Sequence, residues 1–266
     1  MKRIFSVLLS AMIVGGVFVS CEKNKENEAP VLPPENSMVM DFSDFSQQQK
    51  SAKSGEMILT NWSYAALNVV FWNAVATVTS AVPVAAFTHS FEAEPSFLGD
   101  KVWEWSYSVP IGEHTYVSRL EGEVLTDSVE WRMYISLEGA EQAGEFLWFS
   151  GRSASDRSGG WWVLNENPQT PNAILNIEWE NLGEEQGSLR YTYVKPGTEE
   201  YGNYIEFSRE QTDDSPYDSF YTIFNKKENK NLLIEWNSET KEGRVKQYGE
   251  DIWGCWDTEL ADVACE

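Results

Sequence analysis

The chain has 266 residues, of which 42 are Asp or Glu and only 20 are Lys or Arg, so its formal net charge at neutral pH is −22. Such an acidic surface repels nucleic acid and anionic membranes, which excludes nucleic-acid binding as a function. His89 and His114 are the only histidines, too few for a histidine-rich metal site, and no nucleotide-binding or serine-hydrolase motif is present. The sequence therefore predicts no cofactor and no metal.

The first twenty residues have the pattern of a signal peptide. Lys2 and Arg3 precede an apolar run over residues 4–19, as in segments that are removed on export. The ending Phe18-Val19-Ser20-Cys21 resembles the lipobox of bacterial lipoproteins. This resemblance implies that Cys21 becomes the lipidated first residue of the mature chain and attaches it to a membrane.

Residues 21–56 are predicted to form a flexible tether. The sequence Glu-Lys-Asn-Lys-Glu-Asn-Glu after Cys21 resembles the charged tether of Bacteroidota lipoproteins. That resemblance implies an outer-membrane location, with the lipid anchor on the periplasmic side or at the cell surface. Loss of residues 1–20 removes two basic residues and changes the net charge from −22 to −24. Within the tether, Met38–Phe45 is either a first strand or a short segment that packs on the domain.

An uncharged stretch runs from Met57 to Phe91 and marks the start of a single domain over residues 57–266. We expect a helix over about residues 61–82, with Thr60 or Asn61 as N-cap and Pro83 as its end. A broad charged face is missing, so the sequence indicates a buried core helix rather than a surface helix. A membrane span is a second interpretation, and a strand over residues 74–84, which are rich in Val and Thr, is a third.

From residue 101 onward the chain has the alternation and the turn residues of a series of β-strands. Eleven strands are predicted, over residues 101–109, 115–126, 129–138, 145–150, 161–165, 173–180, 188–194, 204–208, 220–225, 232–237 and 244–248. Because no helix separates them, the sheet must be antiparallel. The predicted fold is mainly β, a single antiparallel meander that curls into a barrel, half-barrel or sandwich around the apolar helix.

Three cysteines are present, and lipidation of Cys21 leaves Cys255 and Cys265 as an even pair. In an oxidising compartment we expect these two to form a disulfide that holds the C-terminal tail.

A carboxylate beside an aromatic residue recurs in the predicted strands, at Glu104, Glu130, Glu178, Glu206 and Glu235. Since strand side chains alternate, we expect the aromatic residues to face the helix and the carboxylates to face water. Two of these carboxylates with a nearby Trp could serve a glycoside hydrolase. No family motif surrounds them, so the enzyme hypothesis is the less favoured one.

Trp161 and Trp162 are the candidate ligand-binding residues. Adjacent strand residues cannot both face the core, so we expect one of the two on the other face. The number of Trp residues, twelve, is more than we expect in a core of this size, which favours exposed Trp. Residues 151–160 are predicted to form a long loop, in which Arg152 and Arg157 either clamp an anionic ligand or offset nearby acids. The second of these roles is preferred.

These features define two competing functions for an outer-membrane or surface lipoprotein. The first is non-enzymatic binding of an apolar ligand between the helix and the sheet, an analogy with the half-barrel-plus-helix architecture of periplasmic lipoprotein carriers. The second is a glycan-binding surface module that uses exposed Trp. A helix that fills the barrel would count against the first function, and burial of every Trp against the second. A structural or complex-forming subunit remains a third possibility, which an exposed apolar patch would indicate.

Overall fold

The computed structural model describes residues 28–46, 59–139, 144–181, 186–210 and 215–265. Cys21 and most of the predicted tether therefore lie outside the described residues. The protein is mainly β, with 48% strand and 17% helix, and one long helix precedes the sheet.

One antiparallel sheet contains all fourteen described strands, and each strand pairs with its neighbours in sequence, as predicted for a meander. The sheet does not close into a barrel. Its strands are β1 (Ser96–Gly99), β2 (Val102–Ile111), β3 (His114–Val124), β4 (Ser128–Leu137), β5 (Phe146–Ala154), β6 (Gly159–Asn167), β7 (Thr170–Glu180), β8 (Gln186–Tyr193), β9 (Tyr204–Glu210), β10 (Ser219–Asn225), β11 (Lys230–Trp236), β12 (Gly243–Lys246), β13 (Trp253–Trp256) and β14 (Asp262–Val263).

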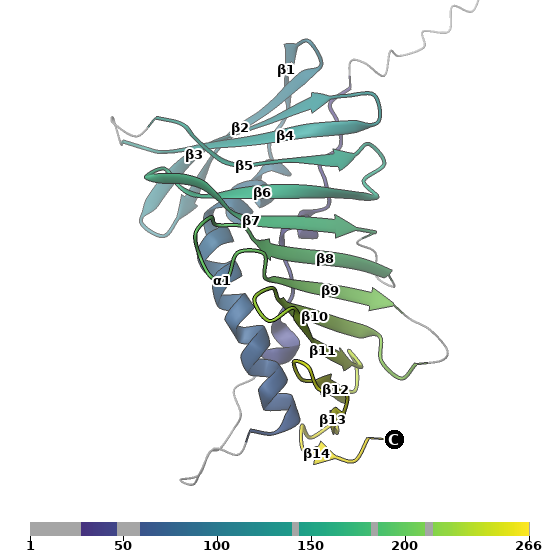
Figure 1. Cartoon of the computed structure of the whole chain (residues 1–266). Coiled ribbons are helices and arrows are strands. Elements are labelled where there is room, and N and C mark those ends of the chain that lie inside the picture. The colour runs from purple at the N-terminus through teal and green to yellow at the C-terminus, as the bar shows by residue number, and fades with distance from the viewer. Residues whose placement is uncertain (1–27, 47–58, 140–143, 182–185, 211–214, 266) are drawn as a thin grey trace, which may run out of the picture.

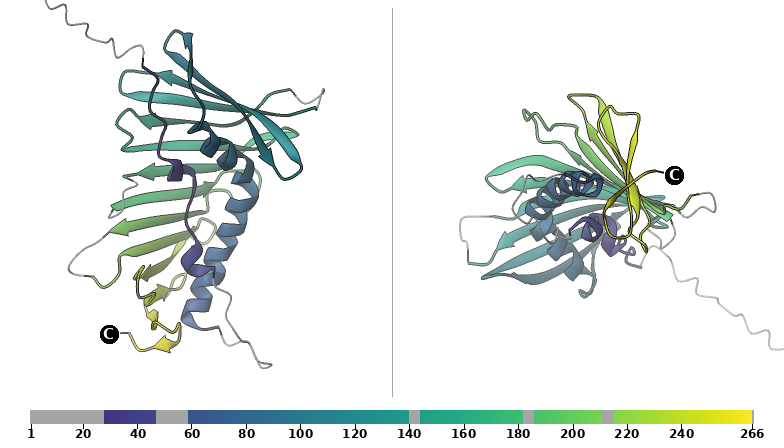
Figure 2. Two further views of the ribbon diagram at one scale, coloured as in Figure 1. Left: turned by 180° about the vertical axis from the view of Figure 1, so that it is seen from behind. Right: turned by 90° about the horizontal axis from the view of Figure 1, so that it is seen from below.

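The sheet curls around the helix α1 (Asn61–Ser90), so that it has a concave face toward α1 and a convex face toward solvent (Figures 1 and 2). All eleven predicted strands are present with small shifts at their ends. The short strands β1, β13 and β14 were not predicted, because runs of two to four residues carry too little alternation to detect.

The helix begins where the sequence predicts and ends later. Thr60 is the N-cap, and its side chain accepts a hydrogen bond from the Ser63 amide at 3.2 Å. The prediction that Pro83 ends the helix is wrong, as is the alternative of a strand over residues 74–84, because α1 continues to Ser90. The turns after Pro83 bury Phe87 against the sheet, and this burial offsets the backbone hydrogen bond that proline removes.

One face of α1 packs into the concave face, while the opposite face lies in solvent. Trp62, Val69 and Trp72 belong to the buried core, whereas Leu67 and Val78 are exposed. By length and composition alone α1 could also cross a membrane. In the structure it packs on the sheet, so the expected buried helix is present but is buried on one side only.

The segment before α1 lies beside it on the concave face (Figure 2). It contains two short 3-10 helices, η2 (Glu35–Met38) and η3 (Ser43–Phe45), so it packs on the domain and is not a first strand. Side chains of the sheet hold it: the hydroxyl of Tyr191 accepts a hydrogen bond from the Met40 amide at 2.8 Å and donates one to the Met38 carbonyl at 2.7 Å. We call residues 29–46 the strap.

Glycine makes room for the large aromatic rings of the concave face. Gly122 pairs with Trp131, Gly151 with Trp162 and Gly160 with Trp179 across neighbouring strands, and a Cβ at any of these glycines would overlap the ring of its partner. Eight of the twelve Trp residues are buried, and three of the remaining four are half-buried. The core therefore holds eight of the twelve, because Gly–Trp pairing lets a single layer accommodate large rings, and one Trp is exposed, as expected.

The predicted disulfide is confirmed, since Cys255 and Cys265 are bonded with their Cα atoms 5.3 Å apart. It links β13 to the chain that follows β14, at the C-terminal end of the sheet.

Candidate binding groove on the convex face

Trp161 and Trp162 point to opposite faces of β6, as the alternation rule predicts. Trp162 is fully buried on the concave face, where its ring lies 5.4 Å from that of Phe87 and its Nε1 donates a hydrogen bond to the Ser37 hydroxyl. Trp161 is 42% exposed on the convex face. All twelve Trp residues lie within the described part of the chain, and Trp161 is the only exposed one among them.

A row of paired residues crosses the convex face through Trp161. The register places Glu130 opposite Arg152, Arg152 opposite Trp161, and Trp161 opposite Glu178. The row continues from Glu178 to Arg190 and then to Glu206. We call this row, from Glu130 on β4 to Glu206 on β9, the polar ladder. One aromatic ring therefore stands in the middle of a line of opposite charges.

The charges of the polar ladder are held in ion pairs. Arg190 bridges two carboxylates, with 2.7 Å from its Nη2 to Glu206 Oε2 and 3.9 Å from its Nη1 to Glu178 Oε2. On the other side of Trp161, Arg152 pairs with Glu130. These cross-strand contacts fix the side chains on both sides of the exposed ring.

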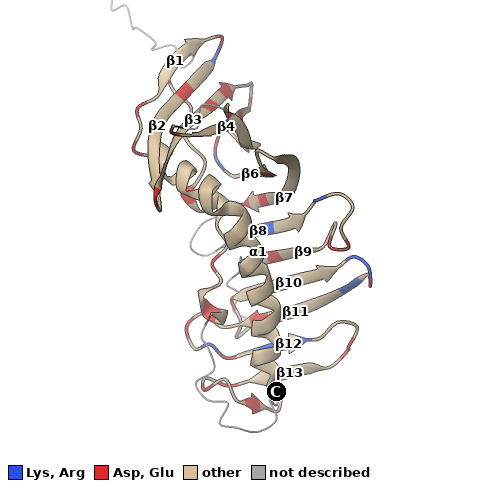
Figure 3. Ribbon diagram, turned by 90° about the vertical axis from the view of Figure 1, so that its left-hand side faces the viewer, with Lys and Arg blue, Asp and Glu red and all other residues tan. Residues whose placement is uncertain are grey.

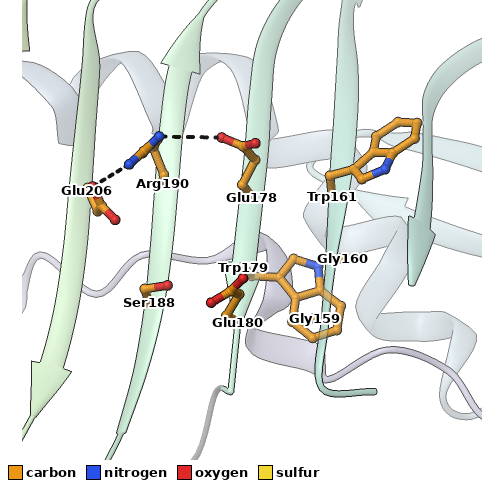
Figure 4. A pocket seen from close by; sticks show the side chains of 9 residues that line it. All are labelled: Gly159, Gly160, Trp161, Glu178, Trp179, Glu180, Ser188, Arg190 and Glu206. Carbon is orange, nitrogen blue, oxygen red and sulfur yellow. Dashed lines mark hydrogen bonds and ion pairs between the residues drawn. The ribbon is translucent and has the colours of Figure 1, made fainter. Parts of the chain in front are cut away.

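A shallow groove lies along the ladder between Trp161 and Glu206 (Figure 4). Its volume is about 480 Å³. The sticks in Figure 4 show Arg190 between the two carboxylates that it bridges, with Trp161 at the far side of Glu178. The lining residues are Gly159, Gly160, Trp161, Glu178, Trp179, Glu180, Ser188, Arg190 and Glu206.

Small residues next to the ladder create this groove. Gly159 and Ser188 both lie opposite Glu180 in the neighbouring row of the sheet. Gly159 has no side chain and Ser188 has a short one, so the surface is low beside Trp161 and Arg190. Sites that bind sugars commonly combine a flat aromatic side chain with nearby polar groups, because a sugar ring has an apolar face and an edge of hydroxyls.

The groove is acidic. Burial alone would lower the pKa of the Arg190 guanidinium, but its hydrogen bond to Glu206 and the nearby negative charges raise it above its ordinary value. The cation also lies over the Tyr204 ring, 4.7 Å from the ring centroid. Against this single positive charge stand Glu178, Glu180 and Glu206, so the groove disfavours anionic ligands.

The structure separates the four candidate residues of the sequence. Trp161 and Arg152 are cross-strand neighbours on the convex face, whereas Trp162 lies in the core. Arg157 lies in the turn between β5 and β6 and has a φ of 62°. The predicted long loop over residues 151–160 is wrong, because β5 extends to Ala154 and β6 begins at Gly159. Gly151 and Gly160 leave room for the rings of Trp162 and Trp179, and the Ser153 hydroxyl accepts a hydrogen bond from Trp131 Nε1.

Arg152 forms an ion pair with Glu130, which agrees with the expectation that it offsets a nearby acid. Sequence reasoning missed Arg190 and Glu180. The alternation of β8 places Ser188 and Arg190 on the same face. A correct prediction of how β7 pairs with β8 would have placed Arg190 opposite Glu178.

The five carboxylates beside aromatic residues behave as predicted, with the carboxylates on the convex face. Each of them also pairs with an arginine: Glu104 with Arg119, Glu130 with Arg132 and Arg152, Glu178 and Glu206 with Arg190, and Glu235 with Arg244. This arrangement uses them as surface counter-ions.

Within the described parts of the chain, no group of three or more His, Cys, Asp or Glu residues is placed to hold a metal ion. Comparison with known proteins adds no relative: no family model, no curated protein and no solved structure matches the chain.

Proposed function

We propose that the protein is a non-enzymatic binding module of the cell envelope, anchored in the outer membrane by a lipid on Cys21, and that it binds a glycan in the convex groove. The observation that carries the proposal is the position of Trp161. Its ring is exposed at the edge of a polar groove, between two sets of ion pairs that hold their side chains in place.

The charge of the groove narrows the ligand class. Three carboxylates and one guanidinium line it, so uronic acids and sulfated sugars would meet repulsion. A neutral glycan can donate its hydroxyl hydrogens to Glu178 and Glu206 and stack on Trp161. We therefore expect neutral sugars, or sugars with an amino group, among the ligands.

The alternative of an apolar ligand between helix and sheet has less support. The concave face is where such a ligand would bind, and side chains of α1 and of the strap already occupy it. Val69 and Trp72 of α1 and Phe45 of the strap are all buried there. Native mass spectrometry before and after organic extraction tests this alternative, and an extractable acyl mass would favour it over the glycan proposal.

The test of the glycan proposal is a glycan-binding screen with the mature chain and with Trp161→Ala. We expect the affinity for a captured neutral glycan to fall at least tenfold, which corresponds to a loss of about 1.4 kcal/mol. Tyr201→Ala is the matched control, because Tyr201 is an aromatic residue of similar exposure, 46%, outside the groove. Equal binding by wild type and Trp161→Ala would contradict the proposal.

The anchor is tested separately. Cys21→Ala in the full chain should abolish incorporation of labelled fatty acid and release the protein from the membrane fraction. Retention of the label in this variant would show that Cys21 is not the lipidated residue.

A further inference from the structure

An apolar stripe runs along the solvent side of α1. Leu67, Val70, Phe71, Ala74, Val78 and Ala81 are exposed and recur at the helical spacing of three or four residues. Val78 is 84% exposed, Leu67 56% and Phe71 54%. At a rise of about 1.5 Å per residue the stripe is roughly 21 Å long. We call it the helix stripe.

The helix stripe carries more of the large exposed apolar side chains than any other described helix or strand. Of the fifteen large apolar side chains that are exposed in the described part of the chain, four lie on α1, namely Leu67, Val70, Phe71 and Val78. α1 has no Asp, Glu, Lys or Arg, and Figure 3 shows it without a charged position along its length. The convex face, in contrast, carries the polar ladder. Such a contiguous apolar area is typical of a protein interface.

We propose that the helix stripe pairs with the helix stripe of a second copy of this chain, antiparallel, about a two-fold axis at Ala74. An interface with this symmetry must be complementary to itself. Reversal of the stripe about Ala74 brings Leu67 opposite Ala81, Phe71 opposite Thr77 and Val70 opposite Val78.

In this arrangement the sizes of the facing residues match. The large residues Leu67 and Phe71 face the small residues Ala81 and Thr77. Ala74 meets its own copy at the crossing point, where a small side chain allows close approach of two helices. A parallel arrangement would instead place Phe71 against Phe71 and Ala81 against Ala81. The helices would then be crowded at residue 71 and would leave a gap at residue 81.

Charge favours a second copy at this face over the convex face. The mature chain has a net charge of −24, so two copies repel each other wherever carboxylates meet. The helix stripe is uncharged, so two copies approach there at a lower electrostatic cost than at the convex face. Since α1 lies on the concave face, this dimer would present both convex grooves outward (Figure 2). A dimer could then hold two glycan chains, or two sites on one chain, with increased avidity.

The salt dependence follows from the same charges. Screening weakens the repulsion between the acidic bodies but leaves the apolar contact in place. We expect self-association to strengthen as salt concentration rises, the opposite of an interface held by ion pairs.

The first test is light scattering of the mature chain, residues 21–266 with Cys21→Ser, over a range of protein and salt concentrations. We expect a dimer whose dissociation constant rises at least tenfold in Val78→Glu. Ile252→Glu is the matched control, because Ile252 is an apolar residue that is 78% exposed outside α1, and it should leave the dimer intact. A wild-type chain that stays monomeric at high salt would overturn the proposal, and so would a Val78→Glu variant that dimerises like wild type.

The second test is the geometry of cross-linking under mild oxidation. Ala74→Cys should cross-link with itself, because the two-fold axis passes through residue 74. Leu67→Cys and Ala81→Cys should cross-link only when the two variants are mixed. Self-cross-linking of both would indicate parallel helices and overturn the arrangement. Monomers that bind phosphatidylcholine vesicles through Val78 would overturn it as well, since the occupant of the stripe would then be a bilayer. None of these outcomes depends on a glycan.

Discussion

The two faces of the sheet are built from the same strands but by different chemistry. On the concave face, aromatic rings lie over glycines of neighbouring strands and are covered by α1 and the strap. On the convex face, arginines bridge glutamates from strand to strand around one exposed ring. Adjacent residues such as Trp161 and Trp162 therefore belong to different environments. Because the buried apolar side chains lie on the concave face, we expect stability to depend mainly on that face.

The same substitution at adjacent positions gives the sharpest test of this difference. Trp162→Ala should lower the free energy of unfolding by about 3–5 kcal/mol, because it empties a fully buried site. Trp161→Ala should change it by less than about 1 kcal/mol. Denaturant titration of the two variants measures both values. Similar losses of unfolding free energy for the two variants would contradict the idea that the concave face provides most of the stability.

Substitution of the adjacent glycines Gly159 and Gly160 should show the same difference in unfolding free energy between the two faces, on a smaller scale. A Cβ at Gly160 would lie 2.5 Å from the Arg152 carbonyl oxygen and 2.8 Å from Cζ2 of the buried Trp179 ring, whereas a Cβ at Gly159 meets the Trp179 carbonyl oxygen at 3.1 Å and Glu180 Cγ at 3.6 Å. Gly160→Ala should therefore cost about 1–3 kcal/mol, and Gly159→Ala clearly less. Thermal unfolding of the two variants compares them directly, and an equal loss would show that the Trp179 ring and the β5 backbone can move aside.

Tyr191→Phe should weaken the attachment of the strap to the concave face of the sheet. This change removes the hydroxyl that bonds to the Met38 carbonyl and the Met40 amide. Both backbone groups are buried and lose this partner, so the free energy of unfolding should fall by about 1–2 kcal/mol. Proteolysis within residues 29–46 should become faster at the same time. Unchanged unfolding and unchanged proteolysis would indicate that the strap is held by its apolar contacts alone.

The same residue makes a pH-dependent contribution. Burial raises the pKa of the Tyr191 hydroxyl above its ordinary value of 10.0. In the unfolded chain this tyrosine ionises first, so its contribution to stability is complete below about pH 10 and is lost as pH rises toward the raised pKa. Wild type should therefore lose stability with rising pH more steeply than Tyr191→Phe. Parallel curves for the two proteins between pH 8 and 11 would contradict this.

The smallest stability effect is expected at the centre of the polar ladder. Arg190→Gln removes both ion pairs of a half-exposed side chain, so it should change the free energy of unfolding by less than about 1 kcal/mol. It should nevertheless weaken glycan binding, because Glu178 and Glu206 would no longer be held in place. A large stability loss in this variant would show that the convex face also supports the fold.

The sequence predicted the sheet well because strand alternation and turn residues are local signals. All eleven predicted strands are present, and the meander follows from their spacing. The N-terminus of α1 was also predictable, since Thr60 caps the helix through contacts within one turn. These features depend on residues that are close in the chain.

Other features depend on contacts that local patterns do not contain. Pro83 stays inside α1 because Phe87, one turn further along, is buried against the rings of Phe149 and Trp162 on the sheet. Residues 151–154 form a strand despite a loop-like composition, because Gly151 lies against the ring of Trp162. Arg190 could be assigned to the groove only once the register of β7 and β8 was known.

The order of elements along the chain also governs how the protein folds. Each strand pairs with the next one, so the sheet can grow hairpin by hairpin from contacts that are short in sequence. α1 precedes every strand, yet its first amide donates a hydrogen bond to Asp262, 201 residues away. The inner face of the helix can therefore be fully covered only after the last strands have formed. Until then both its faces are open, which makes the folding chain most vulnerable to aggregation through this one uncharged element.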